Sequence, residues 1–439
     1  MKPKWNYAWL IFAATCVFSF VGFGLTLNTA SIYWSSVSAE LGVDLAQVSL
    51  MSSLSGIASA IALGVAAPLF NRINLKVFLS IAVVIIVAMY LLSATATNIA
   101  TLYVANIVLG AAKAIAVMLP VPILLGNWFE KRLGLVTGIA GAMTAVGGAI
   151  FSPMIGAIIT GQGWRTAYVV TAVIVLVVVL PFTLFVVKLR PTGAQRPFGH
   201  ESSRQAETMS VAMTGVAARR AFRSVAFICF ALAGIGLQFA GALVQHLPTY
   251  LAATGLSLTV ASSIYSMLLI GASVGKFAMG AAIDFFRPSV AVGIFTLLAV
   301  AGWGGLQLVS GDVLLSITSF AAGMAQAINL VAVVVLVRNT FGAREYSTIL
   351  GPLLMLGSLA NAAGVYVHGA LYTATGSYTM SFVINVAIFL GAFVLLVVAV
   401  RAGKNLPHQT IAGSAASYTS TEPTDDADPQ AATNAAVAR

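Results

Sequence analysis

The run TAVIVLVVVLPFTLFVV, residues 171–187, decides the class of fold, and SIAVVIIVAMYLLS, residues 80–93, has the same character. Both runs are apolar on every side rather than along one face. In lipid, a spanning segment satisfies its backbone hydrogen bonds either within a helix or within a closed barrel. Barrel strands alternate apolar and polar residues over roughly ten positions. These runs are longer and do not alternate, so they predict transmembrane helices.

Similar runs recur along all but the ends of the chain. Of its 439 residues, 59% are hydrophobic and 8% are charged, whereas soluble domains carry about 25% charged residues. A membrane crossing needs about 20 mostly apolar residues. The sequence therefore predicts an all-α membrane protein with twelve spans, near residues 7–30, 46–70, 77–96, 101–126, 134–159, 167–188, 224–252, 260–283, 289–309, 313–337, 348–372 and 379–400.

The positive charges lie almost entirely on one side of this predicted topology. Nineteen of the 22 Lys and Arg residues fall in segments on the side of the N-terminus, Lys113 and Lys276 fall within spans, and Arg165 falls on the other side. Cytosolic loops carry the excess of Lys and Arg in membrane proteins. We therefore expect a multi-pass protein of the inner (plasma) membrane with both termini in the cytosol.

The net charge of +10 follows this loop pattern, so the lipid bilayer is the expected partner and nucleic acid is not. The two cysteines, Cys16 and Cys229, both fall within predicted spans. Two isolated thiols provide neither a disulfide framework nor a metal site. We expect no metal and no cofactor.

The chain divides into two similar halves. Residues 1–190 and 224–404 each hold six spans, 191–223 form a basic cytosolic linker, and the polar tail 405–439 is expected to be disordered. The loop after the fourth span, Asn127–Arg132, resembles the loop after the tenth, Asn339–Arg344. Two repeated halves of six spans are an architecture of secondary transporters.

With this arrangement, the sequence resembles the major facilitator superfamily over residues 5–404. The family motif after the second span matches a degenerate copy here, with Asn71 and Arg72, and Asp284 keeps the acidic residue in the second half. Gly163–Arg165 before the sixth span is also typical. The resemblance implies the major facilitator fold, a monomer, and gating roles for Asn71, Arg72, Asp284, Arg132 and Arg344.

Three segments resemble the monocarboxylate and oxalate/formate antiporter branch of that superfamily. They are Asn127–Phe129 with Arg132 and Gly134, Gln245–Tyr250 in the seventh span, and Gly275–Gly280 in the eighth. Carriers of this branch often place a carboxylate one turn before the basic residue of the eighth span, where this chain has Ala272. Neither substrate nor coupling can therefore be transferred from the branch.

Two lysines stand out within the spans, because the middle of no span holds Asp or Glu. Lys113 lies at the centre of the fourth span and Lys276 lies inside the eighth. An ionised residue at mid-membrane costs at least about 2.5–3.5 kcal/mol on insertion scales. Without a carboxylate partner in the protein, a bound anion is the natural counter-charge. The alternative is that each lysine extends to the interface or is held by backbone carbonyls.

Polar residues accompany both lysines at helical spacing. Asn106 lies on the face of Lys113, and Ser273 and Tyr265 lie on that of Lys276. We predict that this polar set lines a substrate pathway, although helix–helix hydrogen bonding is equally compatible with it. The further candidates are Gln238, Gln245, Asn329 and Asn361.

His246 and His368 are candidates for carrying a coupling proton, because histidine titrates near neutral pH. A structural role is the alternative for both. Tyr33, Trp34 and Trp128 are interpreted as anchors at the membrane interface.

These observations favour a secondary active transporter that moves a small organic anion, a mono- or dicarboxylate, by alternating access. A proton or a counter-anion is the expected second partner, and exchange and symport both stay open. The alternative is a proton-driven drug or metabolite exporter, although such carriers usually need a buried acid. No His-x-x-x-His or phosphate loop is present, and no Gly-x-Ser-x-Gly run lies at a strand-to-helix turn, so the sequence does not suggest an enzyme.

Overall fold

The computed structural model describes residues 6–69, 74–129, 132–189, 191, 198, 213–342, 344–404, 406–407 and 409–411. Among these, nine helical stretches are long and apolar enough to cross a membrane. One of them, Leu135–Val186, is 52 residues long and crosses twice, and the two shorter apolar helices Ala8–Phe23 and Asp312–Ala325 complete the set. The prediction of twelve spans in an all-α membrane fold is confirmed.

The first half contains six crossings. They are built from α1 (Ala8–Val17), the π-helical segment Phe18–Phe23, the 3-10 helix Ala30–Tyr33, α2 (Trp34–Leu41), α3 (Leu45–Leu69), α4 (Leu75–Ala94), α5 (Ile99–Lys113), the π-helical segment Ala114–Met118, α6 (Pro120–Trp128), α7 (Leu133–Ile174) and the π-helical segments Val175–Val179 and Phe182–Val186.

The second half repeats this plan. It consists of α9 (Val225–Gly241), the 3-10 helix Ala242–His246, α10 (Leu247–Ala253), α11 (Leu258–Phe285), α12 (Pro288–Ala299), the π-helical segment Val300–Gly304, α13 (Gly305–Leu308), α14 (Asp312–Ala325), the π-helical segment Ile328–Ala332, α15 (Val333–Phe341), α16 (Tyr346–Thr375) and α17 (Thr379–Gly403).

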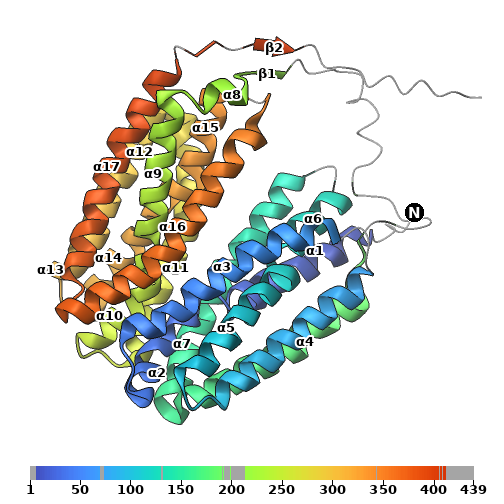
Figure 1. Ribbon diagram of the computed structural model, residues 1–439, viewed down its shortest axis with the longest axis vertical. Helices are drawn as coiled ribbons and strands as arrows, with labels where there is room; N and C mark the ends of the chain where they lie inside the picture. The colour runs from blue at the N-terminus through green and yellow to red at the C-terminus, as the bar shows by residue number, and fades with distance from the viewer. Residues whose placement is uncertain are drawn as a thin grey trace, which may run out of the picture.

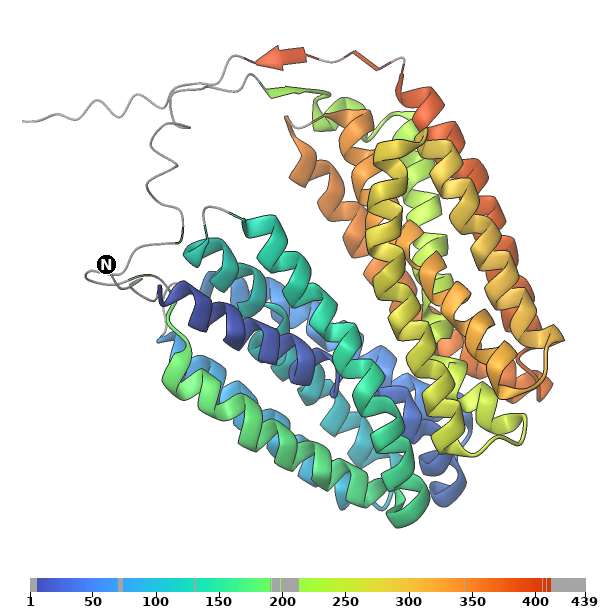
Figure 2. The same ribbon diagram turned by 180° about the vertical axis from the view of Figure 1, so that it is seen from behind.

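The two halves lie side by side as separate bundles (Figure 1). They meet near α2, α7 and α10 and diverge toward the end of the molecule that carries the N-terminus and the β strands, and Figure 2 shows the same divergence from behind. We call that end the termini side and the opposite end the far side. Hydrogen bonds join the halves away from the termini side: the Ser53 hydroxyl donates to the Ala362 carbonyl at 2.7 Å and the Ser266 hydroxyl to the Ala149 carbonyl at 2.9 Å.

The fifth and sixth spans were predicted to be separated by residues 160–166, but α7 runs through this region. Gly163 interrupts it with φ 85° and ψ 163°, values outside the helical range. Residues with a Cβ rarely adopt such a φ. A single glycine therefore makes the turn between two crossings in place of a loop.

Glycines also bring equivalent helices together in the two halves. A Cβ on Gly110 of α5 would collide with the Ser55 backbone of α3, and one on Gly323 of α14 would collide with the Leu268 backbone of α11. Small residues at such crossings allow the close backbone approach that helix association in lipid requires. The fourth span thus packs on the second as the tenth packs on the eighth.

A small two-stranded ribbon lies outside the membrane on the termini side. Strand β1 (Met213–Gly215) of the linker pairs antiparallel with β2 (Gln409–Ile411) of the tail, and the short helix α8 (Ala218–Ala221) follows β1. The Val216 N–H donates to the Phe341 carbonyl at 2.8 Å, which ties the linker to the second half. Most of the linker and the tail beyond β2 lie outside the described residues, so the disorder expected for the tail stays a prediction there.

Candidate functional site

Two neighbouring cavities lie between the halves. The Lys113 cavity has a volume of about 290 Å³ and the Lys276 cavity of about 330 Å³. Spans of both halves line each of them, and the two share Leu27, Gln238, Gln245 and Asn361 in their walls. The two lysines singled out by the sequence therefore face one polar region at the junction of the halves.

Lys113 is held by an irregular stretch of the first span. Its side chain is 3% exposed, and its Nζ donates a hydrogen bond to the Thr26 carbonyl at 3.2 Å. Between Gly24 and Thr29 the first span is not a regular helix, and no backbone N–H of the described residues donates to that carbonyl. The break therefore supplies an acceptor for a buried ammonium, as interrupted helices do in transporters.

Aromatic side chains form the wall behind Lys113. Its Nζ lies 5.8 Å from the centroid of the Tyr90 ring, and Tyr33 stacks on Tyr168 at 4.1 Å between ring centroids. A narrow recess lined by these rings, Trp34 and Asn106 adjoins the Lys113 cavity. The sequence analysis missed Tyr90 and Tyr168 in this role.

The interfacial interpretation of Tyr33, Trp34 and Trp128 is wrong. These side chains are 2%, 1% and 0% exposed. Trp34 is buried because the 3-10 helix Ala30–Tyr33 leads into α2, which continues the first span. Trp128 is buried inside the first half, where its indole N–H donates to the Lys188 carbonyl at 2.8 Å.

Lys276 differs from Lys113 in its surroundings. Its side chain is half-buried in the wall of the Lys276 cavity, together with Tyr265 from one face of α11. Among the described residues, none is seen to form a hydrogen bond or an ion pair with its ammonium group. Lys276 is therefore an available cation in this cavity.

The predicted amides mostly lie in the cavity walls. Gln238, Gln245 and Asn361 face both cavities, Asn106 faces the Lys113 cavity, and Asn329 faces the Lys276 cavity. Asn361 also makes a helix–helix hydrogen bond of the kind proposed as the alternative, because its side-chain amide donates to the backbone carbonyl of Gln238 at 2.9 Å.

Gln326 adds a further amide to the Lys276 cavity. Its side chain is 8% exposed, and its Nε2 has no hydrogen-bond partner among the described residues. Gln326 lies at the end of α14, where the tenth span becomes irregular before Asn329. An unpaired buried amide that faces a cavity is suited to a ligand or to water.

Ser273 is the predicted lining residue that neither cavity includes. Its hydroxyl is buried without a partner among the described residues, whereas Ala272 lies in the wall. Four serines that the sequence analysis did not choose line the Lys113 cavity instead: Ser52, Ser55, Ser59 and Ser358.

The two candidate proton carriers lie outside both cavities. His246 is fully buried, with Nδ1 3.0 Å from the Tyr378 hydroxyl and Nε2 2.9 Å from the Val365 carbonyl. His368 is also fully buried, and its ring centroid lies 6.0 Å from that of His246.

The three gating candidates that the structure describes, Arg132, Asp284 and Arg344, lie away from the cavities, at the ends of helices on the termini side. Arg132 is exposed and begins α7 with φ 64°, and Arg344 is half-buried 3.5 Å from the Glu345 carboxylate. Asp284 is exposed near the end of α11. Asn71 and Arg72 lie outside the described residues, so their gating role stays a prediction.

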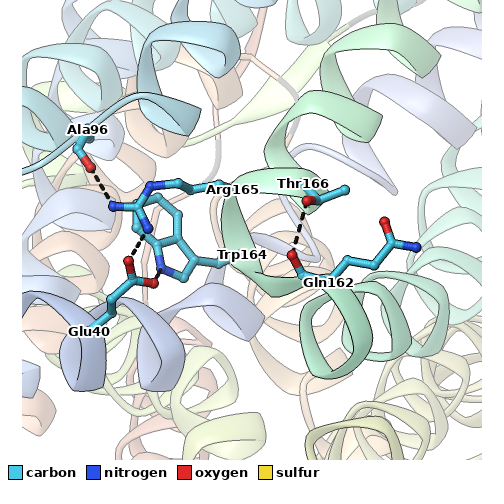
Figure 3. A network of polar contacts seen from close by, with 6 residues as sticks. All are labelled: Glu40, Ala96, Gln162, Trp164, Arg165 and Thr166. Carbon is cyan, nitrogen blue, oxygen red and sulfur yellow. Dashed lines mark hydrogen bonds and ion pairs between the residues drawn. The ribbon is translucent and has the colours of Figure 1, made fainter.

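A polar network closes the far side of the first half (Figure 3). Arg165 forms an ion pair with Glu40 and donates to the Ala96 carbonyl at 3.0 Å, while the Trp164 indole donates to Glu40 at 2.5 Å. The bond from Arg165 is the main cause that lowers the pKa of the Glu40 carboxyl below its usual value. This network ties the first, third and sixth spans together.

The cavities can bind an anion. They present two ammonium groups, seven amides and several hydroxyls, and neither described lining contains an Asp or a Glu. Amides and hydroxyls both donate and accept hydrogen bonds, so they suit carboxylate and hydroxyl groups alike. Within the described residues, no group of three or more His, Cys, Asp or Glu side chains is placed to hold a metal ion.

Comparison with known families places the chain clearly. The model of the Major Facilitator Superfamily matches residues 10–270 and 247–421. Among curated proteins, the 4-hydroxybenzoate transporter PcaK of Pseudomonas putida is 26% identical over 329 residues, which cover 68% of this chain and 71% of that protein.

Solved transporters share the fold. A bacterial homolog of the human lysosomal transporter Spinster, in an inward-facing and unoccupied conformation, matches with a TM-score of 0.71 and 17% identity over 92% of this chain and 98% of that one. A D-xylose–proton symporter matches with a TM-score of 0.66 and 14% identity over 92% and 98%. At these identities the likeness concerns the fold alone.

Proposed function

The chain belongs to the major facilitator superfamily and is a multi-pass membrane transporter, and we propose that its cargo is a small organic anion, a mono- or dicarboxylate. The observation that carries this proposal is the pair Lys113 and Lys276, which face two adjoining cavities whose described walls contain no carboxylate. Buried cations without a counter-charge favour an anionic ligand. The similarity to a 4-hydroxybenzoate transporter supports an organic anion as well.

In the proposed mechanism, the halves rock about the cavities by alternating access, and the protein works as a monomer. The excess of Lys and Arg that the sequence predicts for the side of the N-terminus supports an assignment of that side to the cytosol of the inner (plasma) membrane. The helices of the two halves diverge on that side (Figure 1), which supports a conformation in which the cargo exchanges with the cytosol. Coupling to a proton or to a counter-anion completes the cycle.

The charge balance favours either one dianion or two monoanions in the two cavities. The residues that we assign to cargo binding are Lys113, Lys276, Asn106, Tyr265, Gln238, Gln245, Asn329 and Asn361, with Gln326 added from the structure. The carboxylates of the monocarboxylate and oxalate/formate branch are the first to be tried, because Gly275–Gly280 resembles that branch.

Uptake into proteoliposomes tests the proposal. The panel comprises labelled formate, acetate, lactate, pyruvate, oxalate, succinate and 4-hydroxybenzoate, each with and without unlabelled anion inside. We expect one carboxylate to be taken up and both Lys113→Gln and Lys276→Gln to reduce its uptake. Dependence on internal anion would identify exchange, and dependence on a proton gradient would identify symport. If no carboxylate moves while both variants remain folded, the proposal fails and the proton-driven exporter takes its place.

A further inference from the structure

Two aromatic rings from different halves meet on the far side of the cavities. Trp34 of α2 lies edge to face with His246, with 4.8 Å between ring centroids and 66° between ring planes. Trp34 is 1% exposed and His246 is fully buried. Trp34 also borders the recess behind Lys113, so this contact lies directly between the cargo region and the far side.

The second half fixes the position of His246. A carbonyl oxygen cannot donate, so the contact of Nε2 with the Val365 carbonyl requires that Nε2 carries the proton. Nδ1 is then the acceptor for the Tyr378 hydroxyl. Both nitrogens of a neutral imidazole are satisfied in this way, and the ring is held rigidly against Trp34.

The same arrangement holds no counter-charge for a charged imidazole. A proton on Nδ1 would require the Tyr378 hydroxyl to turn its hydrogen away and to accept instead of donating. The second imidazole, that of His368, lies 6.0 Å away between ring centroids and brings no negative charge. Burying an ion without a counter-charge is strongly unfavourable.

Among the described residues packed around His246, no Asp, Glu, Lys or Arg side chain contacts the imidazole to offset this cost. The ring contacts of His246 come from Trp34 on α2, His368 on α16 and Tyr378 at the start of α17, and Tyr250 of α10 and Tyr372 of α16 pack on Tyr378. On α2 and next to it, Glu40 is engaged by Arg165 and Asp44 is exposed.

We propose that Trp34 and His246 form a latch that closes the cavities on the far side, and that protonation of His246 releases it. Opening the far side would admit water to the imidazole, so only the open state accepts the proton readily. A ligand, here a proton, shifts an equilibrium toward the state that binds it better. The inference rests on the proposed alternating access but is independent of the cargo.

The size of the effect follows from the ordinary titration of histidine. If the open state binds the proton as a solvated histidine does and the closed state excludes it, the open population relative to the closed one rises roughly tenfold between pH 7.5 and pH 5.5. Acid on the far side would therefore favour the state that opens there.

Distances between spin labels on the far side test the latch. The labels are placed at Thr97→Cys and Ser310→Cys, which are exposed in loops of the first and second halves, in a full-length chain with Cys16→Ser and Cys229→Ala. Distance distributions are recorded in nanodiscs without cargo at both pH values. In the labelled chain that keeps His246, we expect the population with the longer distance to increase at the lower pH. His246→Gln keeps a neutral hydrogen-bonding side chain, so its distance between the labels should stay short at both pH values.

Two further variants make the test specific. Trp34→Leu removes the ring contact and should show the longer distance at both pH values, whereas His368→Gln keeps the latch and should retain the response. An unchanged distance in the parent chain, or an equal response in His246→Gln, would overturn the proposal. Because no cargo is present, failure of carboxylate uptake leaves this experiment unaffected, and the converse holds as well.

Discussion

The two halves of the molecule are alike in packing and unlike in charge. Gly110 and Gly323 occupy equivalent helix crossings, each against the backbone of a partner helix. If Gly110 is aligned with Gly323, Lys113 falls opposite Gln326. If Asn71 is aligned with Asp284, Lys276 falls opposite Leu63, a residue in the wall of the Lys113 cavity.

The two halves therefore share the packing of their helices, but the charged side chains that face the cavities lie on different spans. In the first half the lysine lies on the fourth span, and in the second half it lies on the equivalent of the second span. Lys113 is deeply buried and bonded to a carbonyl, whereas Lys276 is half-buried and available. The difference suggests that Lys113 forms the inner, dehydrated contact with the anion and Lys276 the more hydrated one.

Replacing Lys113 should have the largest effect. A hydrogen bond to a charged group contributes about 1.5–3 kcal/mol, and the buried position of Lys113 places it at the upper end. We expect Lys113→Gln to reduce initial uptake at low substrate concentration about 100-fold. Lys113→Arg keeps the charge and serves as the control. Uptake within a few-fold of wild type in Lys113→Gln would refute the inner-contact role.

Replacing Lys276 should have a smaller effect in the same assay. Its half-buried ammonium interacts with the anion through partly hydrated surroundings, which weaken charge interactions. We expect Lys276→Gln to lose about tenfold in uptake at low substrate concentration, and more of the loss to appear in KM than in maximal rate. A greater loss than that of Lys113→Gln would reverse the assignment of the two roles.

The shared packing predicts equal losses of stability in the two halves. Gly110→Ala and Gly323→Ala each place a Cβ against a backbone atom, and overpacking of this kind costs typically 1–3 kcal/mol. Gly126→Ala is the matched control, because its Cβ would have no neighbour within 4 Å. Thermal unfolding in detergent should show both crossings destabilised and the control unchanged, and a loss confined to one half would break the equivalence.

The smallest expected effect concerns the network of Glu40 and Arg165 on the far side. The lowered pKa of Glu40 means that its contribution to stability is present at neutral pH and is lost as the pH falls through the folded-state value. Both side chains are well exposed, so the contribution is small. Glu40→Gln should lower Tm slightly at pH 7 and not at pH 3.5. An equal loss of Tm at both pH values would show that the charge is not responsible.

The sequence allowed prediction of the twelve spans and of both cavity lysines, because apolar length and the cost of an unpaired charge in lipid are local properties. Ser273 was wrongly included: the α11 residues in the cavity wall recur at intervals of three or four, at Tyr265, Leu268, Leu269, Ala272 and Lys276. A period of 3.6 residues does not distinguish these intervals.

The aromatic wall was missed for a different reason. Tyr33 and Trp34 fall where a straight first span would reach the interface, but an irregular stretch begins at Gly24 and α2 extends the crossing. Such a break arises from tertiary contacts, among them the Thr26 carbonyl with Lys113, that no window of sequence contains. The cavity serines were missed because a serine in a helix ordinarily bonds its own backbone.

The β1–β2 ribbon has a practical consequence for handling this protein. Residues 409–411 pair with the linker strand β1, so this part of the tail belongs to the folded structure. A purification tag fused after Arg439 leaves 28 residues of spacing beyond Ile411 and preserves the pairing. Truncation at Pro407 would release β1, and preparations shortened in this way would differ from the full-length chain in susceptibility to proteases.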